Sequence, residues 1–373
     1  MLTHPSLTTA LAQHVARAIG SAGGWIGFER FMQLALYTPG LGYYARGDRQ
    51  FGQMPGPAGS DFVTAPEMTP YFGRALAAQV AQALQVSGTD TVWEFGAGSG
   101  ALAEQLLLAL GESLSLYTIV DVSTALRERQ QQRLAPFGAR VQWVTSLPAQ
   151  FEGIVVGNEV LDAMPVRLLH RVAGQWHERG VGLVDGAQFA WQDHPGPQRP
   201  PLDIEGDHDY LTEMHPQAEG FVRMLSDRLT RGAAFLIDYG FPEREYYHPQ
   251  RAMGTLMCHR AHRMDSDPLA DVGEKDITAH INFTGLALAA QEASVAGAPG
   301  AGLNLLGFTS QARFLMGCGM LSMLESAPLQ DRVMAQKLVM EHEMGELFKV
   351  MAFCRGEPWD AIGFAQGDRS HTL

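Results

Sequence analysis

The sequence predicts an α/β protein built on a parallel, doubly wound sheet, with a helical segment before the sheet and a β-rich insertion within it. Three observations lead to this fold class. Short apolar runs alternate with helical patterns between residues 91 and 160, which is the rhythm of a parallel sheet. Alternating runs separated by glycine follow at 166–192 and predict antiparallel hairpins. Two amphipathic helical patterns, at 7–19 and 25–37, precede the sheet.

The segment between these helices and the sheet is rich in Gly, Pro and aromatic residues at 38–67, and a further helix is predicted at 68–86. Long ordered loops of this composition commonly face a ligand. The alternative is a surface loop held by Tyr43, Tyr44 and Phe62.

The sheet is predicted from five buried strands and the helices between them. The strands are expected at 91–95, 117–123, 141–147, 153–160 and 233–240, and the helices after 100 and near 124–134 and 216–231. Residues 250–373 add a strand at 254–262, helices near 284–293, 309–318 and 329–346, and a last strand at 349–354. We divide the chain into 1–85, a core of 86–260 with the insertion at about 166–215, and a C-terminal part of 261–373 that completes the core.

Composition excludes several classes of protein. The 373 residues include 27 Lys and Arg against 40 Asp and Glu, a net charge of −13, which disfavours a broad nucleic-acid interface. No apolar run reaches the roughly 18 residues that a membrane span needs. Three scattered cysteines and no metal-ligand spacing of histidines predict neither a disulfide framework nor a metal site.

The N-terminus lacks the basic and long apolar regions of a signal peptide, so we expect a cytoplasmic protein. The apolar C-terminal helices are consistent either with core packing or with a homodimer contact.

The clearest local motif is EFGAGSG at 94–100, where a strand runs into glycines and then a helix. Gly96 and Gly98 permit a tight turn and a close approach of the backbone to a ligand. The spacing also fits a dinucleotide-binding loop, or a purely structural turn. Glu94 favours a ligand with a cationic amine over a pyrophosphate. S-adenosylmethionine has an ammonium and a sulfonium and no phosphate, so it is the favoured ligand.

Asp121 ends the second strand, where a carboxylate can accept both hydroxyls of a ribose. This role exists for NAD and for S-adenosylmethionine alike. The alternative is that Asp121 or Ser123 caps the helix at 124–134. Val122 is included in the predicted cofactor site with Asp121.

The fourth strand ends in GNEVLDAMPV at 157–166. Ligands of open parallel sheets bind beyond the carboxyl ends of the strands, and we infer that this strand lies beside the first. Asn158, Glu159 and Asp162 are then expected near the transferable methyl group. Carboxylates match the planar donors of a guanidinium, and they can also take a proton. The alternative is a capped helix that begins at Asn158 and ends at Pro165.

Two further segments contain polar residues at the predicted ligand edge. DYGFP at 238–242 follows the fifth strand, and GEKDITAHINF at 273–283 contains His280. His280 is a candidate base or proton relay, or a structural histidine. Asp276 is expected to cap a solvated helix.

Eight motifs occur in order along the chain: GYY (42–44), SDFVTAPE (60–67), EFGAGSG (94–100), VDVSTALRERQ (120–130), NEVLDAMPV (158–166), DYGFP (238–242), GTLMCHRAH (254–262) and EKDITAHINF (274–283). Together they resemble the MidA-like S-adenosylmethionine-dependent methyltransferases. The resemblance covers roughly residues 25–355. The sequence departs from the family pattern at Ser60, at Asp121 and at Val272-Gly273-Glu274.

The resemblance implies a Rossmann-like class I methyltransferase sheet whose cofactor is S-adenosyl-L-methionine. It implies that the loop at 59–67 closes over the cofactor, and that an arginine side chain of a protein is the acceptor, as in mitochondrial members. The predicted cofactor-binding residues are Asp61, Phe62, Thr64, Glu67, Glu94, Gly96, Ala97, Gly98, Ser99, Asp121, Val122 and Asn158. The predicted catalytic residues are Asn158, Glu159, Asp162 and His280, with no metal.

Two other functions remain open from the sequence. A nicotinamide or flavin oxidoreductase shares the glycine-rich turn, although Glu94 and the acidic end of the fourth strand disfavour it. A non-enzymatic assembly protein could keep the cofactor fold without turnover.

Overall fold

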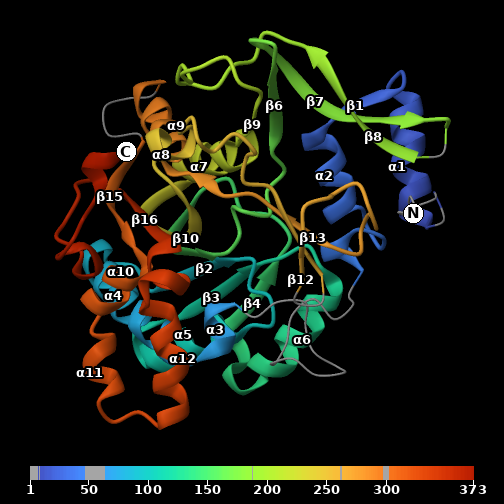
Figure 1. Ribbon diagram of the computed structural model, residues 1–373. Coiled ribbons are helices and arrows are strands. Elements are labelled where there is room, and N and C mark those ends of the chain that lie inside the picture. Colours follow the sequence, from blue (N-terminus) through green and yellow to red (C-terminus); the bar gives the residue numbers. More distant parts are fainter. Residues whose placement is uncertain (1–6, 8, 47–63, 187, 261–262, 297–301) are drawn as a thin grey trace.

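The computed structural model describes residues 7, 9–46, 64–186, 188–260, 263–296 and 302–373 (Figure 1). The helices are α1 (Ala10–Ser21), α2 (Phe28–Tyr37), α3 (Ala65–Met68), α4 (Tyr71–Ser87), α5 (Ala101–Leu110), α6 (Thr124–Leu134), α7 (Pro216–Arg228), α8 (Glu243–Tyr246), α9 (Phe283–Ala296), α10 (Gln311–Gly317), α11 (Met320–Leu324) and α12 (Leu329–Val339). The strands are β1 (Trp25–Gly27), β2 (Thr91–Phe95), β3 (Leu116–Val120), β4 (Val141–Val144), β5 (Phe151–Asn158), β6 (Arg167–Val172), β7 (Gln175–Val184), β8 (Gln188–Pro195), β9 (Tyr210–Met214), β10 (Leu229–Phe241), β11 (Met257–Arg260), β12 (Arg263–Asp265), β13 (Asp276–Thr278), β14 (Ile281–Asn282), β15 (Leu303–Ser310) and β16 (Phe348–Arg355).

The large sheet has the strand order β15-β16-β10-β5-β2-β3-β4, with β14 also paired to β10. Strands β10, β5, β2, β3 and β4 run parallel, whereas β16 and β15 are antiparallel to their neighbours. The fourth predicted strand therefore lies beside the first, as expected. The strand β15 was not predicted, and the helix expected from 309 starts only at Gln311.

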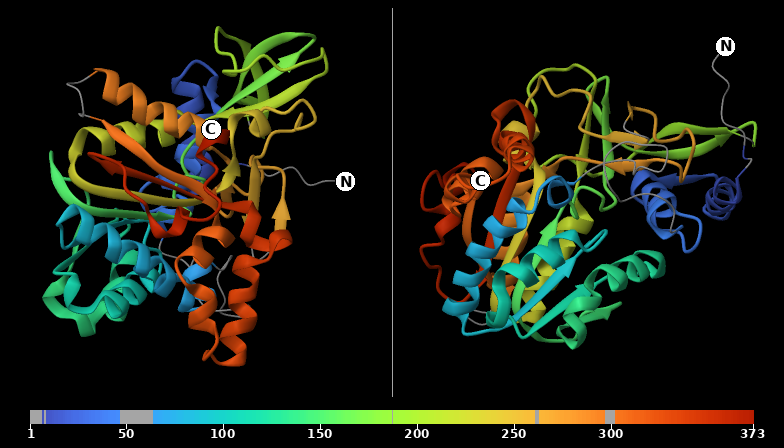
Figure 2. Two further views of the ribbon diagram at one scale, coloured as in Figure 1. Left: turned by 90° about the vertical axis from the view of Figure 1, so that its left-hand side faces the viewer. Right: turned by 90° about the horizontal axis from the view of Figure 1, so that it is seen from below.

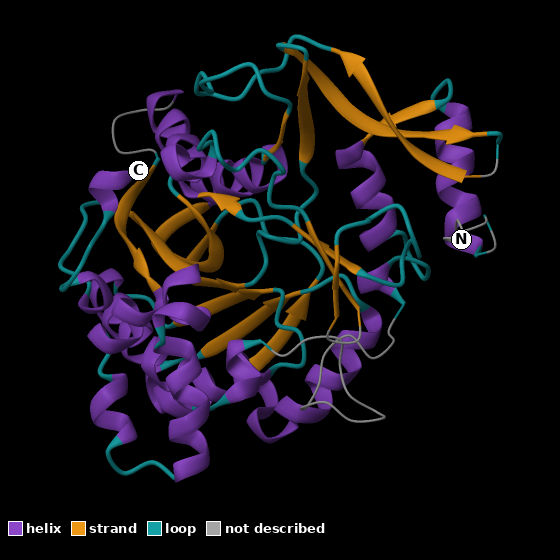
Figure 3. Ribbon diagram, viewed as in Figure 1, coloured by secondary structure: helices purple, strands orange, loops and turns teal. Residues whose placement is uncertain are grey.

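Helices cover both faces of the large sheet, as Figure 3 shows. Along β5, Ile154 and Val156 pack with α4, α5, α10 and α12 on one face, and Val155 packs with α7 and α9 on the other. This alternation is the period of a strand that is buried on both sides. The apolar runs of the sequence are continuous for the same reason.

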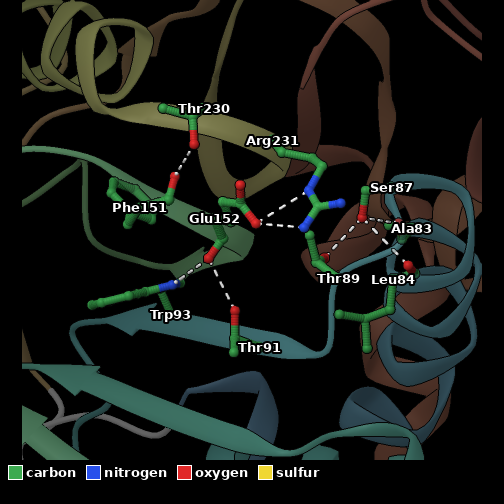
Figure 4. Close-up of polar contacts among 10 residues, drawn as sticks. All are labelled: Ala83, Leu84, Ser87, Thr89, Thr91, Trp93, Phe151, Glu152, Thr230 and Arg231. Carbon is green, nitrogen blue, oxygen red and sulfur yellow. Dashed lines mark hydrogen bonds and ion pairs between the residues drawn. The ribbon is translucent and has the colours of Figure 1, made fainter.

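The amino ends of the central strands are held by polar contacts, drawn in Figure 4. The Glu152 carboxylate pairs with the Arg231 guanidinium at 2.5 Å, and the Glu152 carbonyl oxygen accepts hydrogen bonds from the Thr91 hydroxyl and the Trp93 indole, each at 2.9 Å. These contacts fix the register of β5 against β2 and β10 at the end of the sheet opposite the candidate site.

A second sheet, formed by β1, β6, β7, β8 and β9, packs on α1 and α2. Both views of Figure 2 show this unit beside the large sheet and not within it. The predicted hairpins are present in β6, β7 and β8. The prediction of a helix at 25–37 is wrong for the first three residues. Trp25–Gly27 forms a strand instead, because it pairs with Gly180–Gly182 of β7.

The C-terminal part differs in detail from the expectation. The helix expected at 329–346 ends at Val339, and a π-helical turn with a non-helical Glu343 follows it. The strand expected at 254–262 is limited to β11, which forms a three-stranded sheet with β12 and β13. Within the described residues no helix is long and apolar enough to cross a membrane.

Candidate functional site

A large cavity of about 1350 Å³ lies where the carboxyl ends of β2, β3, β5 and β10 meet. Ligands of open parallel sheets bind at this edge. Every described residue of the predicted site lies on the wall of this one cavity: Thr64, Glu67, Glu94, Gly96, Ala97, Gly98, Ser99, Asp121, Val122, Asn158, Glu159, Asp162 and His280. Asp61 and Phe62 lie outside the described residues.

The glycine-rich turn after β2 has a backbone that only glycine adopts easily. Gly96, Gly98 and Gly100 have φ angles of 64°, 52° and 82°, in the left-handed region. A Cβ on Gly96 would lie 2.7 Å from Cγ2 of Val160. The turn therefore requires glycine both for its backbone angles and for its close packing against the turn that follows β5.

Glu94 is buried at the end of β2, with 2% of its surface exposed, and it accepts a hydrogen bond of 2.8 Å from the Tyr117 hydroxyl. Burial raises the pKa of Glu94 to about 8, and nearby Asp121 adds to the rise. No cationic side chain pairs with Glu94 among the described residues, although Glu94 lies on the cavity wall. A positively charged ligand group would favour the ionised form of this carboxyl and lower its pKa.

The Asp121 carboxylate is held by the chain around it. It accepts hydrogen bonds from the Ser123 amide at 2.8 Å and from the Gln130 side chain at 2.9 Å. The same Gln130 amide also donates to the Gly98 carbonyl at 3.0 Å. Ser123 and not Asp121 caps α6, since its hydroxyl accepts from the Leu126 amide. Asp121 is thus free of the capping role and is fixed beside the glycine turn.

Glu67 and Ser99, both predicted to bind the cofactor, contact each other. The Ser99 hydroxyl donates to the Glu67 carboxylate, and the Arg133 guanidinium donates to both, at 2.6 Å to Ser99 and 3.2 Å to Glu67. The Gln105 side chain donates to the Pro66 carbonyl at 2.7 Å. These contacts fasten α3 to the glycine turn.

The turn that follows β5 carries the predicted acidic residues, and we call residues 158–162 the acidic turn. Glu159 has a φ of 53°, which is strained for a residue with a side chain. Its amide donates to the Ile237 carbonyl at 2.9 Å, and its carboxylate accepts from the Asn158 side chain at 3.0 Å. No helix begins at Asn158, so the alternative of a capped helix is wrong.

Asp238 on β10 holds the acidic turn through hydrogen bonds to its backbone. Its Oδ2 accepts from the Leu161 amide at 2.9 Å and from the Asp162 amide at 3.2 Å, and Asp238 is fully buried. The adjacent Tyr239 hydroxyl donates to Oδ2 of Asp162. Asp238 and Tyr239 were recognised as edge residues from DYGFP but were not included among the predicted site residues. Only the pairing of β5 with β10 shows that they support the turn.

Acidic side chains lie close together in this half of the cavity. Burial raises the pKa of Glu159 to about 8, with a further rise from Asp162, and burial raises the pKa of Asp162 to about 6. Asp276 also lines the cavity, and its carboxylate accepts from the Tyr44 hydroxyl at 2.7 Å. Two buried oxygens, Oδ1 of Asn158 and Oδ1 of Asp162, have no hydrogen-bond partner among the described residues. The wall is therefore suited to a cationic group with several N–H donors.

His280 lies on the same wall between aromatic rings, with its ring centroid 5.0 Å from that of Tyr239 and 5.3 Å from that of Phe241. Its Nδ1 is buried and has no hydrogen-bond partner within the part of the chain that the structure describes. Burial lowers its pKa to about 4, with smaller contributions from Arg251 and Lys349. The imidazole is thus neutral at pH 7, and one ring nitrogen can accept a hydrogen bond. Its role stays a prediction.

The helix that Asp276 was expected to cap is not present. Asp276–Thr278 forms β13 and pairs with β11 of the small sheet, and Asp276 is buried. The polar spacing that suggests a helix cap instead places Asp276, Thr278 and His280 on the cavity wall. Among the described residues no group of three or more His, Cys, Asp or Glu side chains is arranged to hold a metal ion.

Comparisons with known proteins identify the family. The family model described as "Putative S-adenosyl-L-methionine-dependent methyltransferase" matches residues 75–301. A crystal structure of a Burkholderia thailandensis protein with bound S-adenosyl-homocysteine is 49% identical, with a TM-score of 0.90 over 98% of this chain and 96% of that one. A second Burkholderia thailandensis structure is 48% identical, with a TM-score of 0.86 over the same shares of both chains.

Curated relatives are more distant. A Caenorhabditis elegans protein named protein arginine methyltransferase NDUFAF7 homolog, mitochondrial, is 26% identical over 93% of this chain and 87% of its own length. The Homo sapiens protein named protein arginine methyltransferase NDUFAF7, mitochondrial, is 26% identical over 76% of this chain and 69% of its own length.

The cavity fits the cofactor that the comparisons indicate. Glu94 offers a buried carboxylate without a countercharge, the glycine turn leaves room for close approach, and Asp121 offers a fixed carboxylate at the end of β3. The cofactor is S-adenosyl-L-methionine. The fold, the cavity and the relatives together show that the chain belongs to the MidA-like family of S-adenosyl-L-methionine-dependent methyltransferases.

Proposed function

We propose that this methyltransferase transfers its methyl group to a guanidinium nitrogen of an arginine side chain in a protein substrate. The observation that carries the proposal is the acidic turn. A strained Glu159 and a buried Asp162 lie on the wall of the same cavity as the glycine turn, and no cationic side chain of the described residues pairs with either.

The residues of the acidic turn suit a guanidinium in number and kind. A guanidinium carries five N–H donors in a plane and pairs with carboxylates through two parallel hydrogen bonds. Glu159 and Asp162 offer the carboxylates, and Oδ1 of Asn158, which has no hydrogen-bond partner among the described residues, offers one further acceptor. A lysine ammonium would satisfy fewer of these acceptors, since it has three donors and no plane.

The chain's own residues orient the acceptor and receive its proton. S-adenosyl-L-methionine, when bound, supplies a methyl group on a positively charged sulfur. Glu159 and Asp162 would hold the guanidinium so that one nitrogen faces the cofactor half of the cavity. Because burial raises the pKa of Asp162 only to about 6, Asp162 is ionised at pH 7 and is a suitable base for the proton that leaves the methylated nitrogen. Glu159, whose pKa is about 8 in the ligand-free protein, would be ionised when the cationic guanidinium lies beside it.

The names of the distant relatives support arginine as the methylated residue, but they do not identify the substrate protein. The NDUFAF7 proteins are named protein arginine methyltransferases, at 25–26% identity to this chain. The cavity, about 1350 Å³ in volume, is larger than the roughly 300–1,000 Å³ of a site for one small ligand and has room for the cofactor and an acceptor side chain together.

The decisive experiment offers radiolabelled S-adenosyl-L-methionine and the purified protein to a lysate of a strain that lacks the gene. We expect label on arginine residues of one or few proteins, located by mass spectrometry. Glu159→Gln should lower the label strongly, while Glu152→Gln, at the opposite end of the same strand, should not.

The other outcomes are equally clear. Label on lysine, on a carboxyl group or on a small molecule would refute the arginine acceptor. A protein that binds S-adenosyl-homocysteine in calorimetry but labels nothing would favour a non-enzymatic assembly role. Tight NAD binding without a response to S-adenosyl-homocysteine would refute the methyltransferase account of this chain.

A further inference from the structure

A second buried carboxylate, outside the cavity, connects the β-rich insertion to the cavity wall. Glu213 lies on β9 of the insertion and is fully buried. Its Oε1 accepts from the amides of Thr255 at 2.7 Å and Leu256 at 3.0 Å. Its Oε2 accepts from the Tyr246 hydroxyl at 2.8 Å and from the Thr255 hydroxyl at 3.1 Å. Four donors therefore converge on one carboxylate.

The backbone around Glu213 is shaped for this approach. Gly254 has a φ of 70°, and a Cβ there would lie 2.5 Å from Oε1 of Glu213. The Leu211 amide of β9 donates to the Ala252 carbonyl at 2.9 Å. The segment before β11 is thus held against β9 both by its backbone and by the Glu213 side chain.

Thr255 connects Glu213 to the predicted catalytic histidine through hydrogen bonds. Its hydroxyl donates to Glu213 and accepts from the His280 amide at 3.1 Å. The neighbouring Ala279 amide donates to the Asp162 carbonyl of the acidic turn at 3.0 Å. Thr255 and His280 both line the cavity. The backbone of 279–280 is therefore held on one side by the acidic turn and on the other by Thr255.

We propose that Glu213 is a positioning residue of the methyltransferase, which acts through Thr255 to fix His280 on the acceptor wall. The β-rich insertion then forms part of the acceptor site without contacting the substrate through Glu213. That this wall binds the methyl acceptor rests on the proposed function, whereas the positioning of His280 by Glu213 and Thr255 does not.

The hydrogen-bond chemistry identifies the substitution that tests this. A carboxylate accepts on both oxygens, whereas a glutamine offers one oxygen and one NH₂ group. In Glu213→Gln, the two backbone amides can only donate and would keep the side-chain oxygen, so the NH₂ group would face the Tyr246 and Thr255 hydroxyls. Both hydroxyls would have to turn and accept from it, so the Thr255 hydroxyl would lose the acceptor that fixes its orientation. Thr255→Val removes the hydroxyl with little change in shape, and Thr255→Ser retains it.

Hydrogen exchange measured by mass spectrometry tests the positioning without any turnover. We expect Glu213→Gln and Thr255→Val to speed exchange about tenfold or more in peptides that contain 279–280, with residues 91–100 unchanged. Thr255→Ser should restore the wild-type rate. The control is Asp193→Asn, which breaks the ion pair with Arg179 on the insertion sheet and lies away from the cavity wall.

Kinetics with the labelled acceptor test the consequence. Glu213→Gln and Thr255→Val should lower kcat/KM for the acceptor by about tenfold, and the Kd of S-adenosyl-homocysteine should change less than about twofold. Unchanged exchange in both variants would overturn the positioning role. Faster exchange with unchanged kcat/KM would overturn its link to the acceptor site. Label on a residue other than arginine would refute only the proposed function, since the exchange result would stand.

Discussion

Glu159 predicts a pH dependence of stability that one substitution should remove. Its pKa is about 8 in the folded, ligand-free protein, because the carboxyl is buried and lies near Asp162. In the unfolded chain the pKa is 4.5. The folded state therefore binds the proton more tightly, and the stability of the protein falls as the pH rises from the unfolded value through the folded value.

The magnitude follows from these two values. Each pKa unit corresponds to about 1.4 kcal/mol, so the whole shift corresponds to about 4–5 kcal/mol. About half of this loss falls between about pH 6 and about pH 9, or ~2–3 kcal/mol. Glu159→Gln has no proton to release, so its stability should fall by ~2–3 kcal/mol less than that of the wild type over this interval.

The assay is urea unfolding of the ligand-free protein at the two pH values, followed by circular dichroism and by tryptophan fluorescence. The difference between the two proteins reports Glu159 together with its effect on Asp238, whose pKa Glu159 helps to raise, because buried acids such as Glu94 are present in both proteins. Glu152→Gln removes a carboxylate from the same strand at its exposed end and serves as the matched control. An equal loss of stability in wild type and Glu159→Gln would show that Glu159 does not carry the raised pKa that we assign to it.

Three further substitutions test the cavity. Gly96→Val should raise the Kd of S-adenosyl-homocysteine at least about tenfold in calorimetry, because a Cβ would clash with Val160 at a φ of 64°; wild-type affinity would show that the turn does not cradle the cofactor. Asp238→Asn should cost about 1–3 kcal/mol of unfolding free energy and lower kcat/KM, because two amides of the acidic turn lose part of their acceptor; unchanged kinetics would contradict its support of that turn. Tyr239→Phe should retain the fold in circular dichroism and shift the acidic limb of the pH–rate profile upward, since Asp162 loses a hydrogen bond that lowers its pKa; an unshifted limb would mean that Asp162 does not titrate in the profile.

Local sequence determined the elements whose pattern is complete within a few residues. The strand at 91–95, the glycine turn and the helix after it follow from an apolar run, from glycines at positive φ and from an apolar helical stretch, so all three are present as predicted. Ordered motifs over most of the chain also identified the family and the cofactor, and the comparisons confirm both. The division into three parts and the cytoplasmic location stay predictions.

Tertiary pairing decided the elements that are short or at an edge. Trp25–Gly27 is a strand only because β7 offers it hydrogen bonds, and Asp276–Thr278 is a strand only because β11 does. The residues that surround each segment have a spacing that suggested a helix instead. Propensity is a weak signal for such short segments, and pairing between residues far apart in the sequence overrides it.

The sequence by itself determined which residues approach the cofactor edge, because the carboxyl ends of parallel strands converge whatever the details of packing. Only the tertiary structure decided what supports them. Asp238 beneath the acidic turn and Glu213 behind His280 are separated in sequence from the groups that they hold by 42–77 residues. A buried carboxylate takes its role from the donors that surround it, and those donors come together only when the chain is folded.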